Sequence, residues 1–129
     1  MTQHAVSRIA VVILGLIMIA FGVYHFMKPQ NLLVYVPEFM PGGKLWVFLV
    51  GAAFILAAIA FILHKQVKLA GYLLALLLII FVLTIHLPNW LNAGDNDESS
   101  KAFVNLLKDT ALAAFAMYIG SNSQNFDKE

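Results

Sequence analysis

Four long apolar segments alternate with shorter polar ones along the chain, at residues 9–27, 45–63, 69–87 and 102–120. A helix needs roughly 20 consecutive apolar residues to cross a bilayer, and each segment is close to that length. The short connections between them are typical of neighbouring helices that run in opposite directions. The pattern therefore predicts an all-α fold with one domain over residues 1–129, an integral membrane antiparallel four-helix bundle.

The connecting segments differ in character. Residues 28–44 are broken by three prolines and a Gly-Gly pair, but are otherwise apolar, which predicts an interfacial connector that could cap a cavity. Residues 64–68 form a compact basic turn. Pro88-Asn89-Trp90 is expected to stop the third span, and the polar stretch 92–100 is expected to be a solvated loop.

Composition supports the membrane interpretation. Hydrophobic residues make up 61% of the chain and charged residues only 12%, about half the charged fraction of a typical soluble domain. The net charge of +1 gives no general attraction to nucleic acid, so the expected surroundings are lipid and other membrane proteins. The sequence contains no cysteine, which excludes disulfides and thiolate metal sites within it.

The distribution of basic residues gives an orientation. Arg8, Lys65, Lys68 and Lys128 fall on the side that holds both termini, and three lysines fall on the other side. The count alone decides little, but the compact basic turn favours the cytoplasmic side. We therefore expect a multi-pass protein of a bacterial cytoplasmic (inner) membrane with both termini in the cytoplasm.

Polar side chains inside the predicted spans gather at one end of the bundle. His25 and His86 lie near the ends of the first and third spans, and Asn105, Lys108 and Asp109 lie in the first two turns of the fourth. Because consecutive spans alternate in direction, these positions meet in the outer half of the bundle. Ionisable groups are expensive in lipid and mark a candidate functional site.

Helical spacing suggests how these groups pair. Asn105 shares a helix face with both Lys108 and Asp109, whereas Lys108 and Asp109 are adjacent and are expected to make a poor direct pair. Each is expected to find a partner on another helix, and a histidine is a plausible donor to Asp109. His25, His86, Asn105, Lys108 and Asp109 are the predicted cofactor-binding residues.

Several ligands remain open for this polar layer. A quinone is favoured, because its carbonyls need hydrogen-bond donors beside an apolar slot. Haem between His25 and His86 is less favoured because two lone histidines are a common coincidence and would have to face each other. A metal held by these histidines and Asp109 is less favoured because no ligand spacing supports it. Lys108 and Asp109 could also be a purely structural pair that fixes helix register.

Four motifs together resemble the DoxX family of bacterial four-helix membrane proteins: YHFMKP (24–29), VPEFMP (36–41), WVFLVG (46–51) and NLLKD (105–109). The resemblance covers most of residues 15–120. It implies the same fold and an association with quinone-coupled oxidoreductases, often as a small subunit beside other proteins. Many DoxX-like proteins carry a glutamate in a Gly-x-x-Glu pattern, where this chain has Gly51-Ala52-Ala53-Phe54.

Two functions follow from these observations. The first is a DoxX-like membrane subunit of a redox complex that binds a quinone or another lipophile in the outer half of the bundle. If that complex is an enzyme, it is a quinone-linked oxidoreductase. The alternative is a non-catalytic assembly or scaffold subunit of a larger envelope complex, built from other membrane subunits or from copies of this chain.

Overall fold

The computed structural model describes residues 2–126, and every regular element in that range is helical. Lys128, which entered the expected orientation, lies outside it. The helices in chain order are α1 (Gln3–Met27), α2 (Pro29–Leu33), α3 (Lys44–Leu63), α4 (Val67–Phe81), the π-helical turn η1 (Val82–His86), α5 (Leu87–Leu91), α6 (Asn96–Ser121) and α7 (Ser123–Phe126).

Four of the helical stretches are long and apolar enough to cross a membrane: Gln3–Met27, Lys44–Leu63, Val67–Leu91 and Asn96–Ser121. Large apolar side chains are exposed along all four of them. Leu16, Leu56, Leu76 and Tyr118, for example, are each more than half exposed. Such continuous exposed apolar surface is unusual for a soluble monomer and suits contact with lipid.

The long helices form two closely packed pairs, α1 with α3 and α4 with α6. Glycines allow this close packing. A Cβ added at Gly22 would lie 2.8 Å from the carbonyl oxygen of Gly51, and one added at Gly71 would lie 2.8 Å from that of Ala116. Small residues let helix backbones approach one another in this way.

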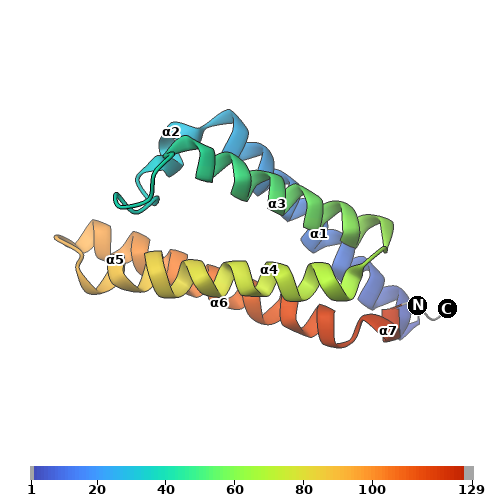
Figure 1. Cartoon of the computed structure of the whole chain (residues 1–129). Helices are drawn as coiled ribbons and strands as arrows, with labels where there is room; N and C mark the ends of the chain where they lie inside the picture. The colour runs from blue at the N-terminus through green and yellow to red at the C-terminus, as the bar shows by residue number, and fades with distance from the viewer. Residues whose placement is uncertain (1, 127–129) are drawn as a thin grey trace.

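The two pairs contact each other much less than the helices within each pair do. In Figure 1 the pairs lie close together at the end that holds both termini and the α3–α4 turn, and they diverge towards α2 and α5. Fully buried side chains such as Val11, Phe61 and Ile119 belong to a core to which α1, α3, α4 and α6 all contribute. The opposite end is left more open.

The fourth span begins earlier than the sequence pattern predicted. α6 starts at Asn96, so 96–100 are helical and the expectation of a loop over 92–100 is wrong for this part. The carboxylate of Asp95 accepts a hydrogen bond from the backbone N–H of Glu98 at 2.8 Å, and acidic residues occupy the first turn. Both features stabilise a helix amino terminus, so the acidic residues initiate the helix.

The third span also continues further than expected. Pro88 was predicted to stop it, but the helix runs on through α5 to Leu91. Proline lacks an N–H and its ring crowds the carbonyl four residues earlier. The widened turn η1 directly precedes Pro88, and its closing bond runs from the N–H of Leu87 to the carbonyl of Val82, five residues back. The proline is therefore accommodated by a local π-helical turn.

Residues 28–44 connect the first pair and contain the short helix α2 followed by turns. Gly42 and Gly43 both have positive φ, which glycine adopts without strain. The indole N–H of Trp46 donates to the carbonyl of Pro41 at 2.6 Å and ties the end of this connector to α3. Phe39 in this connector is 85% exposed.

Candidate functional site

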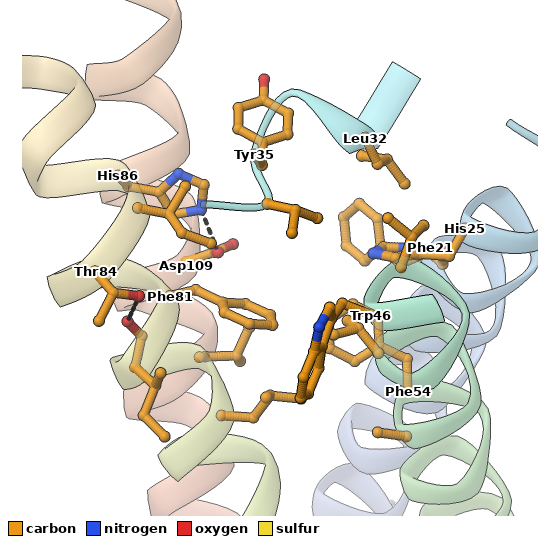
Figure 2. Close-up of a pocket in the computed structure, with 18 of the residues that line it drawn as sticks. Phe21, His25, Leu32, Tyr35, Trp46, Phe54, Phe81, Thr84, His86 and Asp109 are labelled. Carbon is orange, nitrogen blue, oxygen red and sulfur yellow. Dashed lines mark hydrogen bonds and ion pairs between the residues drawn. The ribbon is translucent and has the colours of Figure 1, made fainter. Parts of the chain in front are cut away.

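A partly open cavity of about 700 Å³ lies between the two helix pairs at the end away from the termini. Its walls come from α1, α3, α4, η1 and α6, and the connector 28–44 contributes one side. Most lining side chains are apolar or aromatic, and Figure 2 shows Phe21, Trp46, Phe54 and Phe81 around the space. Ligand-binding cavities commonly have this size and character.

All five residues predicted from the sequence line this cavity: His25, His86, Asn105, Lys108 and Asp109. They do not form a single cluster, however. Figure 2 places His86 and Asp109 on the α4 and α6 side and His25 on the α1 and α3 side. The cavity therefore has polar groups on two opposing walls.

The strongest polar contact joins His86 to Asp109. His86 Nε2 lies 2.8 Å from Asp109 Oδ2, and the two residues are only 8% and 6% exposed. A carboxylate accepts hydrogen bonds, so Nε2 carries the donated proton. The expectation that a histidine donates to Asp109 agrees with this geometry, and the pair joins η1 to α6 within one helix pair.

The position of His86 depends on the π-helical turn, since it is the last residue of η1. Its other ring nitrogen, Nδ1, is buried and has no hydrogen-bond partner in the described part of the chain. An unsatisfied buried polar atom is uncommon in native proteins. Inserted π-helical turns are often found at functional sites.

Lys108 connects the two walls of the cavity. Its ammonium lies 3.7 Å from Asp109 Oδ1, within ion-pair range but longer than a hydrogen bond, so the two neighbours form only the poor direct pair that was expected. Adjacent residues point in different directions from a helix, and the long lysine side chain allows its ammonium to come this close to the carboxylate. The same ammonium lies 5.1 Å from the centroid of the Phe21 ring on α1, a cation–π distance.

Asn105 contacts the connector instead of another span. Its side-chain N–H donates to the hydroxyl of Tyr35 at 3.4 Å, a long and weak hydrogen bond. The Tyr35 ring also meets the edge of His86, with centroids 6.1 Å apart. The sequence analysis did not identify Tyr35 as a site residue. Its position, a tyrosine with a polar hydroxyl in the connector 28–44 that was expected to cap a cavity, was the signal that could have identified it.

His25 is held by its own helix and by α3. Its Nδ1 lies 2.6 Å from the carbonyl oxygen of Phe21, and its ring packs edge-on against Phe54. A carbonyl can only accept, so Nδ1 carries a proton and a neutral His25 has its lone pair on Nε2. Thr84, which also lines the cavity, donates to the carbonyl of Ile80 at 2.6 Å.

These positions bear on the less favoured ligands. The three groups of the possible metal site are divided between two walls, and within residues 2–126 no three His, Asp or Glu side chains gather closely enough to hold a metal ion. For haem, His86 uses Nε2 for Asp109, which leaves only its buried Nδ1 for the iron. A neutral lipophile needs no such set of ligands and fits the arrangement of polar groups on two walls.

Comparisons with known proteins place the chain in a family. No curated protein and no solved structure matches it significantly. A family model described as "Domain of unknown function (DUF8561)" matches residues 14–119, which include the cavity walls and all five predicted site residues. The chain therefore belongs to the DUF8561 family.

Proposed function

We propose that this protein binds a quinone or a similar lipophile in the cavity between its two helix pairs. In this proposal the chain is an antiparallel four-helix bundle of a bacterial inner membrane, with both termini in the cytoplasm. It serves as a DoxX-like subunit of a redox complex. The observation that carries the proposal is a largely apolar cavity of about 700 Å³ with polar groups on two opposing walls.

The proposed roles follow from the contacts. Lys108 has donors beyond those that face Asp109, and its side chain is 42% exposed beside the cavity, so it can donate to a ring oxygen. Asn105 is a second donor, because a bond of 3.4 Å to Tyr35 is readily exchanged for a shorter one to a ligand. The His86–Asp109 pair is the group that could pass a proton, since both members are titratable and hydrogen-bonded.

The proposed association with redox partners comes from the resemblance of 24–29, 36–41, 46–51 and 105–109 to DoxX proteins. The missing glutamate of the Gly-x-x-Glu pattern limits this argument. Phe54 stands at that position, and its ring packs against both His25 and Phe81 in the cavity wall. A mechanism that needs that acid is therefore not part of the proposal.

Native mass spectrometry of the full chain, released from a very mild detergent extract, tests this function. We expect extra mass matching a quinone, and we expect Lys108→Met to lose it while the protein stays folded. Lys101→Met is the matched control, because Lys101 is exposed on the same helix and does not line the cavity. Extra mass from another polypeptide, without any small ligand, would contradict the quinone proposal and favour the assembly subunit.

A further inference from the structure

The cavity presents hydrogen-bond acceptors on both of its polar walls. On the α1 side, His25 uses its Nδ1 proton for the Phe21 carbonyl at 2.6 Å, which leaves an Nε2 lone pair on the neutral ring. The ring is fixed in this tautomer by a contact within its own helix and by edge-on packing against Phe54. In this tautomer His25 therefore offers an acceptor at Nε2.

On the α6 side, Asp109 offers a second acceptor. Its Oδ2 accepts from His86 at 2.8 Å, whereas Oδ1 is 3.7 Å from the Lys108 ammonium. This second distance allows charge attraction but exceeds the 2.7–3.2 Å of a usual N–H···O hydrogen bond. Oδ1 can therefore accept a further, shorter bond. His86 Nδ1, which is buried and has no hydrogen-bond partner in the described part of the chain, carries a further lone pair when the ring is neutral.

The redox form of a quinone decides whether it can use these acceptors. An oxidised quinone has two carbonyl oxygens, which can only accept hydrogen bonds. Their lone pairs would be repelled by the lone pairs of His25 Nε2 and Asp109 Oδ1. A hydroquinone has two O–H groups at opposite ends of its ring, and each can donate. Lys108 can donate to a ring oxygen of either form and so does not discriminate between them.

We propose that this cavity selects the reduced, hydroxyl-bearing form of its ligand, with His25 Nε2 and Asp109 Oδ1 accepting the two hydroxyl protons. This inference rests on the proposed quinone-binding function and specifies it further. It concerns binding only, and no electron transfer is part of it. His25 acts as the specificity-determining residue, because on the opposing wall an oxidised ring oxygen can accept from Lys108 beside the position where a hydroxyl donates to Asp109.

The test is calorimetric titration of the full chain in lipid nanodiscs, in anaerobic buffer, with three matched probes. These are a decyl-substituted benzoquinone, its hydroquinone, and the dimethyl ether of that hydroquinone, which has a similar shape but no O–H donor. We expect the hydroquinone to bind about tenfold more tightly than the other two, the scale of one net hydrogen bond.

His25→Phe keeps an aromatic ring beside Phe54 and removes the acceptor, and His25→Asn can keep the bond to the Phe21 carbonyl without Nε2. Both variants are expected to bind all three probes within about twofold of one another. His64→Asn is the matched control. His64 lies at the far end of α3, outside the cavity, with a positive φ that asparagine tolerates, so the preference should be unchanged.

The outcomes separate the two proposals. If the quinone binds as tightly as the hydroquinone, or if the preference persists in both His25 variants, the selection for the reduced form is wrong while the quinone-binding function stands. If none of the probes binds above the level of empty nanodiscs, the proposed function itself fails. Retained binding of the ether by the His25 variants shows that they are folded.

Discussion

The buried pair His86–Asp109 makes a strong prediction about stability. His86→Leu would leave a carboxylate that is 6% exposed, with only Lys108 at 3.7 Å to balance it, and we expect a loss of about 3 kcal/mol of unfolding free energy. Asp109→Leu would leave the Nε2 proton of His86 without an acceptor, and we expect a loss of about 2 kcal/mol.

The double variant should be more stable than these separate losses imply, because it leaves neither partner unpaired. We expect the loss of unfolding free energy in the double variant to be smaller than the sum of the two single losses by about 2–3 kcal/mol. This difference is the coupling energy of a charge-assisted hydrogen bond in a dry environment. Neutral hydrogen bonds between membrane helices average only about 0.6 kcal/mol in such cycles. The two kinds of bond are therefore well separated by this measurement.

The assay is reversible unfolding in mixed micelles with increasing denaturing detergent, followed by circular dichroism. The control cycle combines Tyr35→Phe with Asn105→Leu, whose bond is 3.4 Å long and only partly buried, and its coupling should not exceed about 0.6 kcal/mol. A coupling for His86 and Asp109 as small as that of the control would refute the reasoning that the pair is charged and dehydrated.

Three further predictions concern the helices that carry the site. Gly71→Ala should lower stability by about 1–3 kcal/mol in the same unfolding assay, because the new Cβ would lie 2.8 Å from the Ala116 carbonyl oxygen. Gly94→Ala in the exposed loop is the control, and equal effects of the two variants would contradict close α4–α6 packing. Asp95→Ala should lose about 1 kcal/mol and speed amide exchange at the start of α6, and unchanged exchange would argue against its capping role. Pro88→Ala should relax the π-helical turn and reduce the coupling energy measured between His86 and Asp109. An unchanged coupling energy in the Pro88→Ala protein would show that the proline does not influence the position of His86.

Much of the architecture was predictable because helices long and apolar enough to cross a membrane leave a simple pattern in the sequence. Apolar stretches of nearly constant length predicted the number and order of the long helices, and the assumption that consecutive helices alternate in direction predicted that His86 and Asp109 lie at the same end, where they are hydrogen-bonded. Helix boundaries were harder. Asp95 was interpreted as part of a loop although it is a cap, and Pro88 was interpreted as a stop although a widened turn accommodates it.

The arrangement of the candidate site could be predicted only in part. Sequence spacing put Asn105, Lys108 and Asp109 near one another, but it could not show that the helices associate in two pairs with a cavity between them. That separation places His25 on the opposing wall from His86. Nor could spacing show that Lys108 reaches Phe21, since a long flexible side chain is not fixed by the helical period.

The central claim is that a lipophile occupies the cavity between the helix pairs, and photoaffinity labelling tests it most directly. The probe is a benzoquinone with a diazirine beside its ring, irradiated with the full chain in nanodiscs and mapped by peptide mass spectrometry. Labels should concentrate on cavity residues such as Phe21, Trp46 and Leu112, and excess unlabelled quinone should suppress them. Labelling spread over exposed positions outside the cavity, such as Leu16 and Leu56, without competition, would contradict the claim.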